Sequence, residues 1–222
     1  MKVALVYTGV TPELTATVES ELKKQLGECE VVSFKDPTII ADAVKAGYVT
    51  RYCAARLVTL FMEAVNADAD AILNICSSVG DVADAAQDLA KLVGVPIVRI
   101  DEEMCREAVR RGKRIGVMAT LPTTLDPTRN TVKRVAREMD KRIETVDVLV
   151  EGGFGLNPDQ FLELMAKYAR EVADKVDVLL FAQGSMAYAE EHIREVTGKE
   201  VLSSPRFGAL ALKRALQDKG LI

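Results

Sequence analysis

The sequence is poor in the side chains that many metal-dependent and nucleic-acid-binding proteins use. It contains one His and no Trp, and aromatic residues make up only 5% of the chain. A single His removes most His-based metal sites and leaves one candidate for a His-dependent catalytic triad. So few aromatic rings also argue against a surface on which nucleic-acid bases stack. We therefore expect neither a metal centre nor a nucleic-acid partner.

Long apolar runs and closely spaced cysteines are also missing. Without a run of about 18 apolar residues, no transmembrane helix and no membrane partner are expected. The start of the chain, Met1–Tyr7, becomes polar too soon for a signal peptide and is typical of a strand. Because no cysteines are spaced C-x-x-C, a disulfide framework or a structural zinc site is not expected. A reducing cytoplasm is the simplest location for cysteines at positions 29, 53, 76 and 105.

The chain has no excess of positive charge. Its net charge is −4, so it has no overall basic field to attract phosphate backbones. Residues 106–114 are locally basic, and we interpret them as a solvated helix end instead of a binding patch. Apolar residues make up 49% and charged residues 28% of 222 residues, which is typical of a globular protein of one or two domains.

Apolar runs alternate with longer amphipathic segments along the whole chain. This alternation predicts an α/β fold with parallel sheets wrapped by helices. Residues 35–46 are expected to be irregular or only partly helical. The expected strands cover 2–7, 30–34, 71–75, 97–100, 115–118, 143–150, 177–182 and 200–202, and the expected helices cover 12–27, 48–66, 80–92, 101–111, 126–139, 159–174, 186–196 and 205–219.

The order of the motifs repeats within the chain. Asp70 precedes Cys76 by the same six residues that separate Asp177 from Gln183, and each pair spans a predicted strand. We therefore predict two similar doubly wound parallel-sheet domains related by a pseudo-twofold, with a site in the cleft between them at the carboxyl ends of the strands. The predicted domains comprise residues 1–100 with 205–222, and residues 101–204.

Cys76 is the strongest catalytic candidate from the residues alone. A thiol between a strand end and a helix start lies near unpaired backbone N–H groups and the positive end of the helix dipole, which favour the thiolate. Such a thiolate can take a proton from carbon or attack it. The amides, with the hydroxyls of Ser77 and Ser78, can bind a carboxylate. Alternatively, Cys76 fills apolar space, as free cysteines often do.

Three segments together resemble the aspartate/glutamate/hydantoin racemase superfamily. They are Ala69–Cys76, Ile115–Thr123 and Asp177–Ala187, and the resemblance extends over nearly the whole chain. It implies two similar α/β domains, a small anionic substrate, catalysis without a cofactor, and a homodimer or higher homo-oligomer. In this superfamily two cysteines face each other across the substrate α-carbon, and one removes a proton while the other returns one. Maleate isomerases and arylmalonate decarboxylases are related members.

The resemblance assigns roles to individual positions. Cys76 corresponds to the catalytic cysteine of the first half. Gln183 occupies the position of the second cysteine, and an amide is neither a useful acid nor a useful base near neutral pH. The residues expected to bind substrate are Thr8, Thr11, Asn74, Ser77, Ser78, Thr120, Thr123, Thr124, Gln183, Gly184 and Ser185.

We therefore predict a cofactor-independent isomerase that acts on a small carboxylate or carbonyl acid. Cys76 would act alone, as a base that exchanges protons on one face or as a nucleophile that adds to an activated double bond. The alternatives are a carboxylate-binding protein without catalysis and a decarboxylase of the arylmalonate type. In each reaction, backbone amides after Cys76 and Gln183 would stabilise negative charge that develops on the substrate.

Other motifs are weaker candidates. His192 lies on a charged helix and is interpreted as a surface residue, while Cys53 and Cys105 lie within helices and are interpreted as packing residues. The segment Gly152–Gly155 lacks the third glycine of a dinucleotide-binding fingerprint and is expected to form a mobile loop over the cleft.

Overall fold

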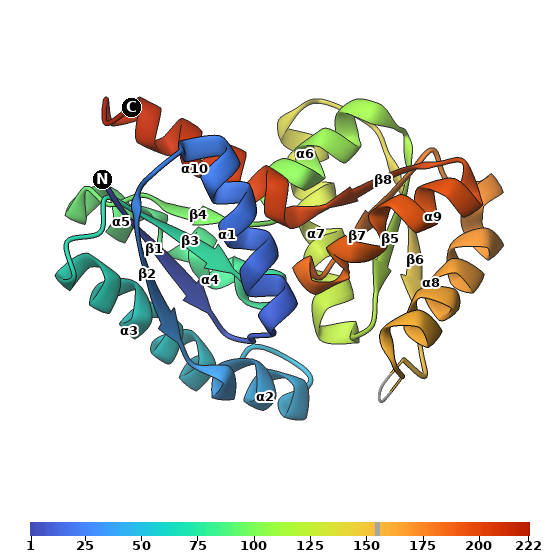
Figure 1. Cartoon of the computed structure of the whole chain (residues 1–222), viewed down its shortest axis with the longest axis horizontal. Coiled ribbons are helices and arrows are strands. Elements are labelled where there is room, and N and C mark those ends of the chain that lie inside the picture. The colour runs from blue at the N-terminus through green and yellow to red at the C-terminus, as the bar shows by residue number, and fades with distance from the viewer. Residues whose placement is uncertain (154–155) are drawn as a thin grey trace. The chain divides into compact units, whose positions relative to one another are not determined.

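The computed structural model describes residues 1–153 and 156–222, and the chain divides into two compact units (Figure 1). The first unit comprises residues 1–100 and 205–222, and the second comprises residues 101–204. The chain therefore leaves the first unit once and returns to it for the last helix. The loop expected at Gly152–Gly155 lies partly outside the described residues.

Four parallel strands form the sheet of the first unit, in the order β2-β1-β3-β4. The two inner strands are almost wholly buried and apolar, as is usual for parallel strands covered on both faces. The strands are β1 (Lys2–Tyr7), β2 (Glu30–Lys35), β3 (Ala71–Ile75) and β4 (Ile97–Arg99). The helices are α1 (Pro12–Leu26), α2 (Pro37–Ala46), α3 (Arg51–Asn66), α4 (Gly80–Ala85), α5 (Gln87–Val93) and α10 (Ser204–Asp218), with a 3-10 helix, η1 (Ser77–Val79).

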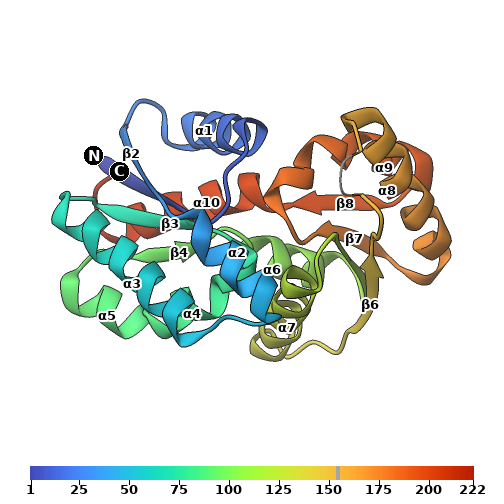
Figure 2. The same ribbon diagram turned by 90° about the horizontal axis from the view of Figure 1, so that it is seen from below.

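Successive residues of the inner strands face opposite apolar clusters. Val3 and Leu5 pack with α1 and α10, whereas Ala4 and Val6 pack with α2, α3, α4 and α5. Figure 2 shows α1 and α5 on opposite sides of this sheet. Because side chains of a strand alternate between its faces, this run of apolar residues fills both cores at once.

The second unit repeats this architecture. Its parallel sheet has the order β6-β5-β7-β8, and its strands are β5 (Arg114–Ala119), β6 (Glu144–Leu149), β7 (Val178–Phe181) and β8 (Glu200–Ser203). The helices are α6 (Glu102–Arg111), α7 (Pro122–Glu138), α8 (Pro158–Val172) and α9 (Glu190–Thr197), with 3-10 helices η2 (Ala173–Lys175) and η3 (Gly184–Ala189). Met118 and Phe181 pack with α8 and α9 on one face of the sheet.

The repeated aspartates occupy equivalent places in the two units. Asp70 accepts a hydrogen bond from the backbone N–H of Lys2 at 2.8 Å, and Asp177 accepts one from that of Arg114 at 2.9 Å. Each aspartate N–H also donates to the carbonyl of that same partner, at 2.8 Å in both cases. The predicted fold class, two similar doubly wound α/β halves, is confirmed.

Three helices differ from the expected pattern. The segment 35–46, expected to be at most partly helical, contains the complete helix α2, which the Asp36 side chain caps. Helix α7 begins at Pro122 instead of near residue 126, because it accommodates Pro127 in its interior. The helix expected over 80–92 is two helices, α4 and α5, which meet at Ala86.

Within residues 1–153 and 156–222, none of the helices has both the length and the apolar character that crossing a bilayer requires.

Candidate active site

The carboxyl edge of the first sheet brings Thr8 and Cys76 together. β1 and β3 pair in parallel through Tyr7 and Ile75, so the residues that follow each strand are neighbours. Thr8 is fully buried, while Cys76 is half-buried. Cys76 also packs against the apolar cluster beneath α3 and α4, while the residue as a whole stays partly exposed.

The turn after Cys76 has the predicted strand-turn-helix form. Cys76 is extended at the N-cap of η1, and its side chain makes no capping hydrogen bond. Ser77 and Ser78, both predicted to bind substrate, lie in η1 and are buried. The chain continues directly into α4, so the thiol precedes two short helical segments.

Two buried oxygen atoms at this edge lack a hydrogen-bond partner among the described residues. They are the Thr8 hydroxyl and the Asn74 Oδ1 atom. The other side of the Asn74 amide is fixed, because its Nδ2 donates to the carbonyl of Cys76 at 3.2 Å. Leaving such a buried group unsatisfied costs about 1–3 kcal/mol. A polar ligand or an ordered water is the usual partner for atoms of this kind.

Tyr7, the last residue of β1, is not suited to proton transfer. Burial, together with the nearby charge of Glu19, raises the pKa of Tyr7 to about 12, against a lowering contribution from a hydrogen bond with Thr15. Its phenol therefore stays neutral throughout the physiological range, and its ring faces the α1 side of the sheet.

A buried arginine beside the turn was not identified from the sequence. Arg99 is 3% exposed, donates to Asp84 Oδ2 at 2.6 Å and lies 3.7 Å from Asp81 Oδ1. Gly80 provides the space, since a Cβ there would lie 2.2 Å from Nη2 of Arg99. The signal was available: a charged residue in an apolar strand needs a partner, and two aspartates lie on the helix after Cys76.

The carboxyl edge of the second sheet places Thr120 beside Gln183. Met118 and Phe181 pair in parallel two residues earlier, as Val6 and Asn74 do in the first unit. Gln183 therefore occupies the position equivalent to Cys76. Its Oε1 accepts from the backbone N–H of Thr120 at 3.1 Å, and its Nε2 donates to the Thr120 hydroxyl. The Gln183 amide is thus held in place from both sides.

The neighbouring predicted residues of the second unit lie in helical segments. Thr123 and Thr124 belong to the first turn of α7, and Gly184 and Ser185 begin η3. The Thr123 hydroxyl is buried without a partner among the described residues. The start of α7 has no side-chain cap, and the positive end of a helix dipole favours anions.

One predicted binding residue, Thr11, also has a structural role. The Thr11 hydroxyl caps α1 by accepting from the backbone N–H of Leu14 at 3.2 Å. Cys53 and Cys105 are buried within helices, in agreement with packing. His192 is partly exposed and lies 3.5 Å from Glu163.

No cluster of three or more His, Cys, Asp or Glu side chains with the proximity of metal ligands occurs among the described residues. The chemical groups at the two edges are one thiol, several hydroxyls, two amide side chains and backbone N–H groups. These groups suit the binding of a small polar or anionic molecule.

The sequence decides the family. Residues 4–212 match the Asp/Glu/Hydantoin racemase family model, a span that includes both carboxyl edges. The chain belongs to the Asp/Glu/hydantoin racemase family. The family recognised from the three sequence segments is thereby confirmed. No curated protein sequence matches this member of the family.

Solved structures share the fold of this family member at low sequence identity. A glutamate racemase isoform, RacE1, of Bacillus anthracis has a TM-score of 0.75 and 18% identity, with 99% of this chain and 82% of that chain covered. A glutamate racemase of Francisella tularensis in complex with D-glutamate has a TM-score of 0.67 and 14% identity, with 100% of this chain and 82% of that chain covered. An arylmalonate decarboxylase has a TM-score of 0.59 and 12% identity, with 97% of this chain and 92% of that chain covered.

Proposed function

We propose that this protein is a cofactor-independent isomerase in which Cys76 acts on a small carboxylate or carbonyl acid. The observation that carries the proposal is the position of half-buried Cys76 beside two buried oxygens, those of Thr8 and Asn74, which have no hydrogen-bond partner among the described residues. Family membership supports an isomerase, and the similar Francisella tularensis enzyme has D-glutamate, a small carboxylate, bound.

Gln183 decides which isomerase chemistry we propose. Its amide carries no useful acid or base, and both of its ends are engaged with Thr120. We therefore assign carboxylate binding to Thr120, Thr123 and Gln183, and proton transfer or covalent addition to Cys76 alone. As a base, the Cys76 thiolate takes the α-proton and leaves an enolate. The resulting thiol then returns a proton on the same face, to the same carbon in solvent exchange or to an adjacent carbon in isomerisation, and the thiolate is restored. As a nucleophile, it adds to an activated C=C bond, which rotates as a single bond before the thiolate leaves.

Solvent-exchange measurements test the first of these reactions. A panel of amino, hydroxy and keto acids is incubated with the protein in D₂O, and loss of the α-proton signal is followed by NMR. We expect exchange with at least one acid, abolished by Cys76→Ser and unaffected by Cys29→Ser, which removes another half-buried thiol of the same unit. Exchange that survives Cys76→Ser would contradict the assignment of the base.

Unsaturated diacids test the second reaction. If Cys76 adds to a double bond, mass spectrometry of the intact protein should detect a trapped adduct, and cis-trans isomerisation should depend on the same thiol. A Gln183→Cys variant adds a second thiol at the equivalent position of the second unit. We expect it to convert proton exchange on one face into racemisation; retention of configuration in a folded, exchanging variant would contradict the equivalence.

A carboxylate-binding protein without catalysis is the second candidate. It is favoured by the packing of Cys76 against an apolar cluster and by the reciprocal bonds of Gln183. Calorimetric binding of an acid that shows no exchange, no isomerisation and no loss of CO₂ would establish it. Release of CO₂ from an arylmalonate would instead favour the decarboxylase, whose fold this chain shares.

A further inference from the structure

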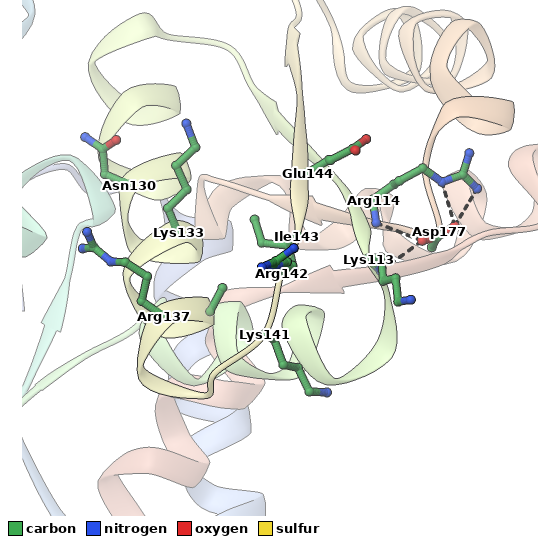
Figure 3. Close-up of a pocket in the computed structure, with 11 residues that line it drawn as sticks. Lys113, Arg114, Asn130, Lys133, Arg137, Lys141, Arg142, Ile143, Glu144 and Asp177 are labelled. Atoms are coloured by element: carbon green, nitrogen blue, oxygen red, sulfur yellow. Dashed lines mark hydrogen bonds and ion pairs between the residues drawn. The ribbon is translucent and has the colours of Figure 1, made fainter.

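A hollow lies at the amino edge of the sheet in the second unit, opposite its carboxyl edge. Its volume is about 1050 Å³. Figure 3 shows Lys133 and Arg137 on α7, the Arg114–Asp177 pair on the far side, and Arg142 and Ile143 between them. The six-residue strand β5 separates the edges, a distance of roughly 20 Å at ~3.3 Å per residue. This hollow is therefore distinct from the carboxyl edge that holds Thr120 and Gln183.

The lining of the hollow is strongly basic in an acidic protein. Six basic side chains and two acidic ones line it, which gives a formal charge of +4. The whole chain carries −4, so the remainder carries −8. The basic side chains are Lys113, Arg114, Lys133, Arg137, Lys141 and Arg142, and the acidic ones are Glu144 and Asp177.

Most of these cations are not neutralised by neighbouring carboxylates. Arg114 is paired with Asp177 at 2.6 Å, and Lys141 donates to the carbonyl of Val109 at 3.3 Å. Across residues 1–153 and 156–222, the side chains of Lys113, Lys133, Arg137 and Arg142 make no hydrogen bond or ion pair, whereas Arg106, Arg110 and Arg111 nearby do. Of the basic segment 106–114, only Lys113 and Arg114 line the hollow, while Arg106, Arg110 and Arg111 are each paired with glutamates.

The unpaired cations come from three segments of the chain. Lys133 and Arg137 are four residues apart on α7, so they lie on one face of that helix. Arg142 precedes β6, and Lys113 precedes β5. Between these elements, Ala136 and Ile143 provide an apolar part of the lining. Basic side chains outnumber acidic ones in this lining by six to two, an arrangement that a bound anion would stabilise.

We propose that this hollow binds a small, multiply charged phosphate compound. The guanidinium groups of Arg137 and Arg142 match phosphate oxygens in bidentate geometry, and the lysines add point charges. A single phosphate would leave most of the 1050 Å³ and most of the charge unused. A long nucleic acid would extend over the acidic remainder of the chain, which repels it. A compact anion with several phosphates fits both the volume and the charge.

An adjoining hollow extends the same surface. It has a volume of about 600 Å³. It shares Lys113, Lys141, Arg142, Ile143 and Asp177 with the first hollow. The ligand therefore has room beyond its phosphates for a further, less charged group.

Tripolyphosphate is the probe, titrated into the full chain by isothermal calorimetry in buffer of low ionic strength. We expect saturable binding at least tenfold tighter than that of orthophosphate. We expect the double variant Lys133→Gln/Arg137→Gln to weaken it at least tenfold, and the affinity to fall as salt is added. The matched control is Lys167→Gln/Arg170→Gln, which removes two exposed cations from α8 of the same unit and should change affinity less than twofold.

Several results would overturn this proposal. They are an absence of tripolyphosphate binding, equal affinity for orthophosphate, or equal losses in the two double variants while circular dichroism shows both to be folded. Self-association that the α7 double variant abolishes, without anion binding, would identify the hollow as a contact between copies of the chain. Cys76→Ser should bind tripolyphosphate as tightly as the unmodified chain, so this test is independent of the proposed catalysis.

Discussion

Replacing Gly80 by alanine should disturb the turn after Cys76 through Arg99. The added Cβ would lie 2.2 Å from Nη2 of Arg99, far inside the separation of about 3.5 Å at which non-bonded atoms make contact. Arg99 cannot swing into solvent, because it is 3% exposed and held by Asp84 at 2.6 Å. The substitution therefore has to displace a buried ion pair or the backbone of the turn.

The size of the effect follows from two contributions. Overpacking a core position costs about 1–3 kcal/mol, and a weakened hydrogen bond between charged groups costs about 1.5–3 kcal/mol. Because the two distortions relieve each other, we expect a loss of about 3 kcal/mol in the free energy of unfolding. At about 2–4 °C per kcal/mol, the melting temperature should fall by roughly 6–12 °C. Urea denaturation and thermal melting measure these quantities.

Two further variants isolate the cause. Gly9→Ala is the matched control, because its Cβ would meet Ile40 at an ordinary contact distance of 3.5 Å, and we expect it to cost less than about 0.5 kcal/mol. In an Arg99→Ala background the clash is absent, and Gly80→Ala should be neutral or stabilise α4 by about 0.5–1 kcal/mol, since alanine favours helix over glycine. An equal cost in both backgrounds would refute the role given to Arg99.

Three other substitutions have defined outcomes. Thr11→Ala should lower the free energy of unfolding by about 1 kcal/mol through loss of the α1 cap, as urea denaturation would measure. Gln183→Leu leaves the polar groups of Thr120 unpaired and should cost about 1–3 kcal/mol in the same assay. Hydrogen bonds from Arg114 hold the pKa of Asp177 at about 2, below its ordinary 3.8. The stability gained from this charge is complete above pH 4 and is lost as the pH falls through about 2. The difference in free energy of unfolding between the unmodified chain and the Asp177→Asn variant should therefore shrink across that range, as urea denaturation at several pH values would measure. A difference that stays constant with pH would contradict the lowered pKa.

The alternation of strands and helices is predictable because it depends on local features of the sequence, namely apolar runs and helix caps. β1 and β3 are apolar runs bounded by polar residues, and α1 begins after a threonine cap and ends at a glycine. α2 was underestimated because ten residues carry little periodic signal, although Asp36 and a following proline were present. The start of α7 was misplaced because a proline inside a helix usually marks its first turn.

The contacts at the candidate site depended on distances that spacing cannot supply. The sequence placed Gln183 at the equivalent of Cys76, but only the structure shows its amide bound to both the N–H and the hydroxyl of Thr120. The sequence pattern does not single out Arg99, because its partners come from the helix before its own strand. The basic hollow combines residues from four separate segments, so no single stretch of sequence marks it.

The position of α10 has a consequence for biosynthesis. Ala209, Leu212 and Leu216 fill the core that Val3 and Leu5 of β1 also line, yet residues 101–204 of the other unit are translated between them. During synthesis, the first unit therefore cannot complete its core until residues 101–204 have been translated. One face of its sheet stays uncovered during that time, while the second unit emerges as an uninterrupted segment. Nascent chains arrested before residue 205 should then bind chaperones through the β1 face, although the inserted unit is already complete.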